Sequence, residues 1–176
     1  MKLLVLGYAR SGKDTVAEML EKIYSLNFCS SSEFANHRIV FPILTKKYNY
    51  QTLSECFNDR FNHRQEWFEI ISAYNRPHDR LAKEIILEND IYVGMRNKNE
   101  LKASRNLFDH ILWIEAEARG IKKEDINSCN ITPDDCTYVL KNNSDIHHLK
   151  TQVILFGETI GLKKKKTQIN LINVKH

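Results

Sequence analysis

The chain has 176 residues, of which 42% are hydrophobic and 27% are charged, which is the composition of a single globular domain. No apolar run approaches the roughly 20 residues of a transmembrane helix, and the four apolar residues after Lys2 are too few for a signal peptide. The net charge of +4 comes from residues 157–176, where five lysines face one glutamate, so the rest of the chain is balanced and is not a basic nucleic-acid binder.

The basic tail, residues 157–176, is therefore the one segment charged strongly enough to contact DNA; the alternative is a solvated C-terminal segment without a binding role. The four cysteines are scattered, with no Cys-x-x-Cys pair of the kind that predicts a zinc site. Reduced thiols of this kind are typical of the cytosol, and we expect a cytoplasmic protein without a membrane segment.

The first elements are short and apolar. Residues 2–6 predict a fully buried strand. A helix is expected from about Gly12, because apolar side chains recur at helical spacing over residues 16–23. Residues 26–29 predict a second strand, and residues 30–33 predict a turn with a helix N-cap.

The middle of the chain, residues 33–88, predicts mainly helix. The clearest helix starts near Asn62 and carries an apolar stripe over residues 67–74, which we expect to pack in the core. Pro77 ends this helix, and another covers residues 79–87.

Three further strands are expected, over residues 91–95, 110–114 and 137–140, and a last helix over residues 144–157. A charged stretch, residues 115–135, separates the last two strands. Short apolar strands that alternate with helices predict an α/β fold, in which a parallel sheet of about five strands carries helices on both faces as a three-layer sandwich.

A phosphate-binding loop follows the first strand. Gly7, Gly12 and Lys13 have the G-x-x-x-x-G-K spacing of a P-loop, with a strand before it and a helix after it. In such a loop the backbone N–H groups point at phosphate oxygens, and the lysine reaches the β- and γ-phosphates. We expect ATP to bind to residues of the loop and the helix start: Gly7, Ala9, Arg10, Ser11, Gly12, Lys13, Asp14 and Thr15.

Asp14 stands where a P-loop usually carries the Ser or Thr that binds Mg²⁺. A carboxylate is a good hard ligand for this ion. We expect Asp14 to take the metal-side role, while the Thr15 hydroxyl helps at a more distal phosphate oxygen. ATP and Mg²⁺ are therefore the expected cofactors.

The loop sequence over residues 7–15, Gly-Tyr-Ala-Arg-Ser-Gly-Lys-Asp-Thr, resembles the loop of phage deoxynucleoside monophosphate kinases, a family of the P-loop nucleotide kinase superfamily. Residues 94–96, Gly-Met-Arg, followed by Glu100, resemble the Asp-Val-Arg strand end and later Glu of these kinases. Residues 111–119 are similar to their next strand and its exit. The resemblance implies a P-loop kinase domain over residues 1–156, located in the host cytoplasm if the chain is phage-encoded.

One family position differs, because Gly94 stands where these kinases carry the strand-end Asp. Asp90 lies four residues earlier, about 13 Å away along the strand and at the wrong end of it for a nucleotide. We expect Asp90 to be a turn residue at the strand entry. Binding of the metal by protein carboxylates would then depend on Asp14, or on Glu115 and Glu117 after the fourth strand.

Arginines are the candidates for holding the acceptor. Arg60 and Arg64 are four residues apart, so on one helical segment they would share a face and grip a phosphate bidentately. The alternative is a solvated face on which Asp59 and Glu66 pair with them. Arg96, matched to the family at a strand's carboxyl end, is expected to act in both acceptor binding and catalysis.

The charged segment, residues 115–135, lies where small nucleotide kinases carry a mobile lid over the transferring phosphate. Arg119 is the candidate catalytic residue of this lid. A general base is needed only if the acceptor is an alcohol, which must lose a proton. Glu33 is the candidate for that role and Asp59 is another, although an acid at either place is also ordinary at a helix end.

These features imply transfer of the ATP γ-phosphate to a deoxynucleoside 5′-monophosphate, giving the diphosphate and ADP, with an acceptor side at about residues 30–88. One alternative is a P-loop kinase that phosphorylates the hydroxymethyl group of a modified pyrimidine, such as 5-hydroxymethyldeoxyuridine, within phage DNA. Glu33 would then be the base and residues 157–176 a DNA anchor. Another alternative, which the missing strand-end Asp favours, is a nucleotide-binding or ATP-hydrolysing module. No motif fixes the preferred base or the oligomeric state.

Overall fold

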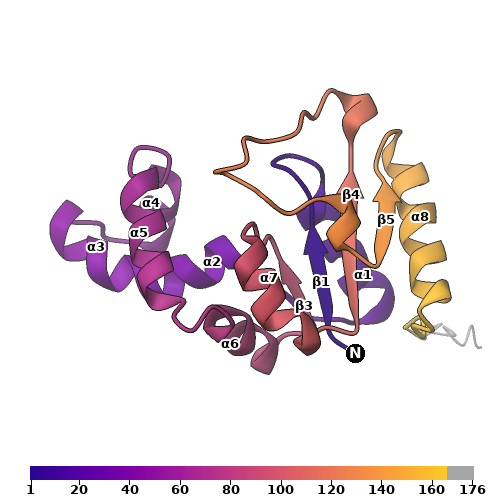
Figure 1. Ribbon diagram of the computed structural model, residues 1–176, viewed down its shortest axis with the longest axis horizontal. Helices are drawn as coiled ribbons and strands as arrows, with labels where there is room; N and C mark the ends of the chain where they lie inside the picture. The colour runs from indigo at the N-terminus through magenta and orange to yellow at the C-terminus, as the bar shows by residue number, and fades with distance from the viewer. Residues whose placement is uncertain (166–176) are drawn as a thin grey trace, which may run out of the picture.

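The computed structural model describes residues 1–165, which contain a five-stranded parallel sheet (Figure 1). The strands are β1 (Leu3–Leu6), β2 (Phe28–Ser30), β3 (Ile91–Val93), β4 (His110–Glu115) and β5 (Tyr138–Lys141). Their order is β2-β3-β1-β4-β5, and each neighbouring pair is parallel. The central strand is β1, so the P-loop leaves the middle of the sheet.

Helices connect these strands. The α-helices are α1 (Lys13–Tyr24), α2 (Ser31–Ala35), α3 (Phe41–Tyr48), α4 (Leu53–Asp59), α5 (Arg64–Tyr74), α6 (Arg80–Glu88), α7 (Lys98–Ser104) and α8 (Ile146–Thr159). A π-helical turn, η1 (Asn36–Val40), and three 3₁₀ turns, η2 (Arg105–Leu107), η3 (Glu117–Arg119) and η4 (Pro133–Asp135), complete the described elements. None of these helices is long and apolar enough to cross a membrane.

The sheet has an apolar cluster on each face. Leu3 and Val5 point to one face and Leu4 and Leu6 to the other, as the pleat of a strand requires. Helices α1 and α8 cover the first face, and α6 and α7 pack on the second (Figure 1). All four residues of β1 are fully buried, as expected for a strand between two helical layers. The predicted three-layer α/β fold is confirmed.

Helices α3, α4 and α5 form a lobe beside the sheet (Figure 1). On α5, Trp67 is buried, and the other members of its apolar stripe pack against the core, as predicted. Arg60 and Arg64 do not share one helical segment, and that prediction is wrong. Helix α4 ends at Asp59 because a turn forms there, in which Asn62 N donates to the Asp59 carbonyl at 2.9 Å and Asn62 Nδ2 to its carboxylate at 2.6 Å.

Helix α7 was not predicted from the sequence. It is seven residues long, and only Leu101 and Ser104 of its residues are buried, so it has little apolar periodicity. The Asn97 side chain starts the helix by accepting a hydrogen bond from Asn99 N at 2.8 Å. A helix this short depends on its cap and on packing against the sheet.

The C-terminal helix α8 runs through Thr159, past the tail boundary expected at residue 157. Beyond it the chain still packs against α1, since Lys165 N donates to the Ile23 carbonyl at 2.8 Å. The remaining part of the predicted basic tail, residues 166–176, lies outside the described residues. A role of the tail in binding DNA stays a prediction.

Candidate active site

The P-loop joins β1 to α1 at the carboxyl edge of the sheet. Gly7 and Gly12 have φ angles of 147° and 95°, which L side chains rarely adopt. A Cβ atom on Gly12 would lie 2.5 Å from Asn142 Nδ2, and one on Gly7 would lie 2.6 Å from Ser11 Oγ. Asn142 Nδ2 donates to the Ser11 carbonyl at 2.8 Å, so the exit of β5 fixes the loop. The close packing explains why both positions are glycine.

The start of α1 fits a phosphate group. Its N-cap, Gly12, has no side chain to cap the helix, so the first backbone N–H groups lack acceptors within the helix. Lys13 is only 9% exposed, and its Nζ donates to the Tyr8 carbonyl at 2.8 Å. Burial and the nearby Arg96 lower the pKa of Lys13. Uncapped N–H groups beside a buried ammonium make the anion site that a nucleotide phosphate needs.

A carboxylate already lies against this loop. Glu124, in the segment after β4, accepts a hydrogen bond from Ala9 N at 2.5 Å through one oxygen and pairs with the Arg96 guanidinium through the other. Its negative charge lies near Lys13 and opposes the lowering of the lysine pKa that burial and Arg96 cause. Glu124 therefore contacts the same groups that would hold a phosphate. No sequence spacing indicates this contact, which joins residues 115 positions apart.

A cleft of about 850 Å³ separates the P-loop from the α4–α5 lobe. The loop contributes Ala9, Arg10, Lys13 and Asp14 to its lining. The lobe contributes Arg60 and Arg64, and the segment after β3 contributes Arg96, so all three arginines predicted for the acceptor line the cleft. The tertiary structure thus brings the predicted donor and acceptor sides to one cavity.

The carboxylates expected to pair with the arginines have other partners. Asp59 accepts from Tyr50 Oη at 2.5 Å and lies 3.0 Å from His63 Nε2. Glu66 contacts Lys47 Nζ at 2.7 Å and accepts from Tyr48 Oη at 2.8 Å. The alternative in which these acids neutralise the arginines is therefore wrong.

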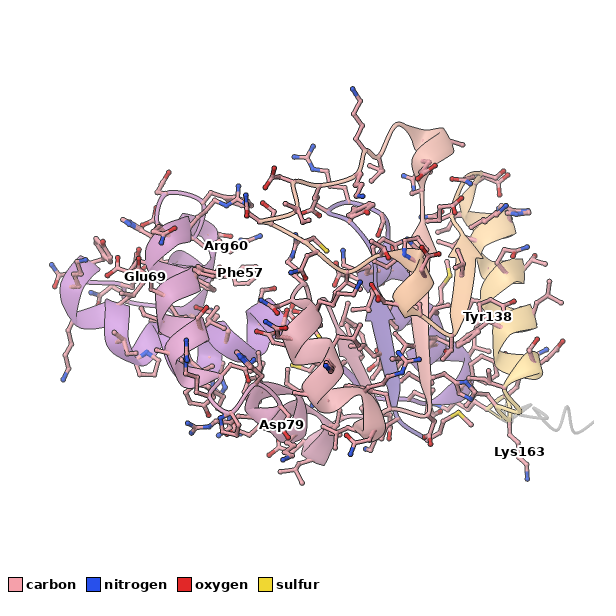
Figure 2. The ribbon with its side chains drawn as sticks, in the orientation of Figure 1. Phe57, Arg60, Glu69, Asp79, Tyr138 and Lys163 are labelled. Carbon is pink, nitrogen blue, oxygen red and sulfur yellow. The ribbon has the colours of Figure 1, made fainter. Side chains whose placement is uncertain are left out.

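Arg60 and Arg64 form no ion pair within residues 1–165. The Arg60 guanidinium lies 3.9 Å from the ring centroid of Phe57 and 4.3 Å from that of Phe61, and it donates to the Phe57 carbonyl at 2.6 Å. Figure 2 shows Arg60 beside Phe57, on the side of the lobe nearer the sheet. Stacking holds the guanidinium in place without neutralising its charge, so it can bind an anion.

The residues predicted for the metal lie at the start of α1. Asp14 is exposed and lines the cleft, whereas Thr15 is partly buried and does not line it. Glu115 and Glu117 line a smaller cavity of about 280 Å³ beside Ser11. Among the described residues, no three His, Cys, Asp or Glu side chains group as a metal site. A magnesium ion here would depend on phosphate oxygens together with Asp14.

Three other predicted residues lie away from the cleft. Glu33 is exposed in the first turn of α2, where its backbone N donates to Ser30 Oγ at 3.2 Å, and it lines neither cavity. Arg119 is exposed in η3 and also lines neither cavity. Asp90 accepts from Asn27 N at 3.1 Å at the entry of β3, which confirms its turn role.

The fold recurs in solved structures of P-loop kinases. The chain is similar to shikimate kinase from Aquifex aeolicus, with a TM-score of 0.50, 14% identity, and 92% of this chain and 99% of that chain covered. It is also similar to shikimate kinase from Bacteroides thetaiotaomicron, with a TM-score of 0.52, 10% identity and coverages of 91% and 98%. TT1252 from Thermus thermophilus matches with a TM-score of 0.51, 17% identity and coverages of 93% and 98%.

The chain shares its fold with these two shikimate kinases. No protein-family model matches the sequence, and a search of curated proteins finds no match. At these low identities the likeness establishes the fold alone. What reaction the protein catalyses therefore depends on the residues of its own P-loop and cleft.

Proposed function

We propose that the protein transfers the γ-phosphate of ATP to a deoxynucleoside 5′-monophosphate, forming the diphosphate and ADP. The observation that carries this proposal is the single cleft in which Lys13 of the P-loop faces Arg60 and Arg64, neither of which pairs with an acid within the described residues. Two anion-binding groups on opposite walls suit two phosphorylated substrates, because arginine forks hold phosphate bidentately.

In this proposal the P-loop N–H groups and Lys13 hold the donor phosphates, and Arg60 and Arg64 hold the acceptor phosphate. Arg96 lines the cleft between the two walls, where it would neutralise charge on the group in transfer. Mg²⁺ bound with the nucleotide would supply further neutralisation of the phosphate charges, with Asp14 and Thr15 as its proposed protein partners. Positioning and charge neutralisation then account for most of the catalysis.

The set of acidic residues that lines the cleft favours a phosphate group over an alcohol as the acceptor of the γ-phosphate. A monophosphate attacks with an ionised oxygen and needs no base, whereas an alcohol does. Glu33 and Asp59, the candidate bases, do not line the cleft. Of the acids that do, Glu124 is held by Ala9 N and Arg96, and Asp14 stands in the metal position.

A transfer assay tests the proposal directly. The protein is incubated with γ-labelled ATP, Mg²⁺ and either each deoxynucleoside monophosphate or duplex DNA with and without 5-hydroxymethyldeoxyuridine. We expect label in a nucleoside diphosphate. Label only in the modified DNA would replace the proposal with a DNA hydroxymethyl kinase, and label only in inorganic phosphate would indicate an ATP-hydrolysing module.

A further inference from the structure

A second cavity, of about 520 Å³, adjoins the arginine side of the cleft. Arg64, Phe68 and Arg96 line both this cavity and the cleft. A ligand with its phosphate at Arg60 and Arg64 therefore has this second cavity next to it. We name it the distal cavity.

Helix α5 lines the distal cavity along its length. Arg64, Phe68 and Ser72 are spaced by four residues, so they lie on one face of the helix. The rise from Arg64 to Ser72 is about 12 Å, which is comparable to the span of a nucleotide from its phosphate to the far edge of its base. Phe68 lies between these two residues and is 61% exposed. An exposed aromatic ring in a cavity is suited to stacking against a base.

Glu100, in the first turn of α7, also lines the distal cavity. Burial raises the pKa of its carboxyl, while the neighbouring Asn75 side chain and His78 lower it. Tyr92, another lining residue, is only 1% exposed, and its pKa is raised by burial and by the charge of Glu100. Within residues 1–165 no basic side chain forms an ion pair with Glu100.

The first turn of α7 favours an acid at this place, because a helix N-terminus attracts negative charge. The Asn97 side chain caps the helix through Asn99 N, and the Glu100 carboxylate forms no hydrogen bond to the Asn97 backbone that would complete a capping box. The Glu100 side chain is partly buried and has the Asn75 side chain beside it as a donor, and because a carboxylate accepts several hydrogen bonds, it can accept more from a ligand in the cavity. A ligand whose N–H groups face Glu100 would supply such donors.

The hydrogen-bonding groups of each nucleobase decide whether it can donate to the Glu100 carboxylate. An ionised carboxylate only accepts hydrogen bonds. Guanine presents two adjacent N–H donors on its pairing edge, and adenine and cytosine each present an amino group. Thymine and uracil present one N–H between two carbonyl oxygens, and these oxygens would repel the carboxylate.

We propose that the distal cavity binds the base of the acceptor nucleotide, and that Glu100 selects bases with an amino group over thymine and uracil. This inference rests on the proposed function, because that function places the acceptor phosphate at Arg60 and Arg64, and Arg64 also lines the distal cavity. It deepens that function by naming the substrate class, with guanine as the best match for the two carboxylate oxygens.

Binding measurements test the inference separately from catalysis. Dissociation constants of the five common deoxynucleoside 5′-monophosphates are measured by calorimetry for the wild-type protein and for Glu100→Gln. We expect the wild type to bind the amino-bearing monophosphates at least about tenfold more tightly than those of thymine and uracil. An amide both donates and accepts, so Glu100→Gln should bring this ratio close to one.

The matched control is Glu21→Gln, an exposed acid on α1 that lines neither cavity, and it should keep the wild-type ratio. Unchanged ATP affinity in both variants shows that they fold. Equal affinity for all five monophosphates, no binding of any of them, or a preference that survives in Glu100→Gln overturns the inference. Selective binding by the wild type that Glu100→Gln removes, without label transfer, supports the inference and refutes the proposed kinase activity.

Discussion

At the scale of single residues, Glu124 contacts P-loop and cleft groups that are proposed to hold phosphate. Its carboxylate accepts from Ala9 N, pairs with Arg96 and acts on Lys13, and all three groups are proposed to contact phosphates. A nucleotide whose phosphates contact these groups must displace this carboxylate. Glu124 belongs to the segment after β4 for which a lid was predicted, and we expect this acid to lower the affinity of the loop for a nucleotide.

Glu124→Gln should therefore strengthen ATP binding, by about three- to tenfold, because the neutral amide competes less well for cationic and N–H partners. Titration of both proteins with ATP and Mg²⁺ gives the dissociation constants, and Glu21→Gln again serves as the control. Weaker binding by Glu124→Gln would show that the acid helps to hold the nucleotide and would contradict the competition.

At the scale of elements, the turn between α4 and α5 places two arginines on one cavity, Arg60 from the turn itself and Arg64 from the start of α5. Asp59 makes this turn through Asn62 and is held in place by Tyr50 and His63. Helix formation alone does not direct the two guanidinium groups. The turn sets the path of the backbone between them, and Phe57 and Phe61 hold the Arg60 guanidinium.

Arg60→Ala and Arg64→Ala should each raise the KM for the monophosphate by about tenfold or more, because each removes a charged hydrogen-bond donor. The KM for ATP should stay near its wild-type value, since neither arginine is proposed to contact the donor. Steady-state kinetics with both substrates varied measures this. Arg38→Ala, at an exposed arginine paired with Glu88 on α6, is the control. A rise confined to the KM for ATP would contradict the assignment of the two walls.

A further prediction at the scale of elements concerns the packing of α8 against α1. Gly157 lies against the Tyr24 ring, and a Cβ atom there would be 2.3 Å from Tyr24 Cζ. Gly157→Ala should lower the free energy of unfolding by about 1–3 kcal/mol, because the buried ring must shift. Thermal and denaturant unfolding measure the change, with Lys150→Ala on the exposed face of α8 as the control. An unchanged or higher free energy of unfolding would contradict this prediction, because it would show that the Tyr24 ring shifts without loss of stability.

At the scale of the whole molecule, the chain packs against α1 as far as Lys165. Deletion of residues 166–176 should therefore leave the fold and the transfer to a monophosphate unchanged. If these residues bind DNA, the deletion should weaken DNA binding and reduce its dependence on salt, because fewer counterions are released. Gel-shift titrations at several salt concentrations measure this. Loss of monophosphate transfer on deletion would show that the tail belongs to the kinase domain.

Much of this architecture could be predicted from short stretches of the sequence. The buried run of β1 and the Gly7 and Gly12 spacing identify the loop, because strand, turn and helix follow each other directly in the chain. The apolar stripe of α5 likewise identifies a core helix. Helix α7 could not be found in this way, because its stability depends on one Asn cap and on packing rather than on periodicity.

By itself, the sequence determined the fold class and the phosphate-binding loop, since both depend on patterns within a few neighbouring residues. Only the tertiary structure showed that Arg60, Arg64 and Arg96 line one cleft with Lys13 and that Glu33 and Arg119 lie outside it. It also showed that Glu124 lines this cleft and that Glu100 lines the distal cavity. The physical reason is that a site assembled from separate elements depends on how those elements pack. Spacing along the chain carries no record of contacts between residues more than a hundred positions apart.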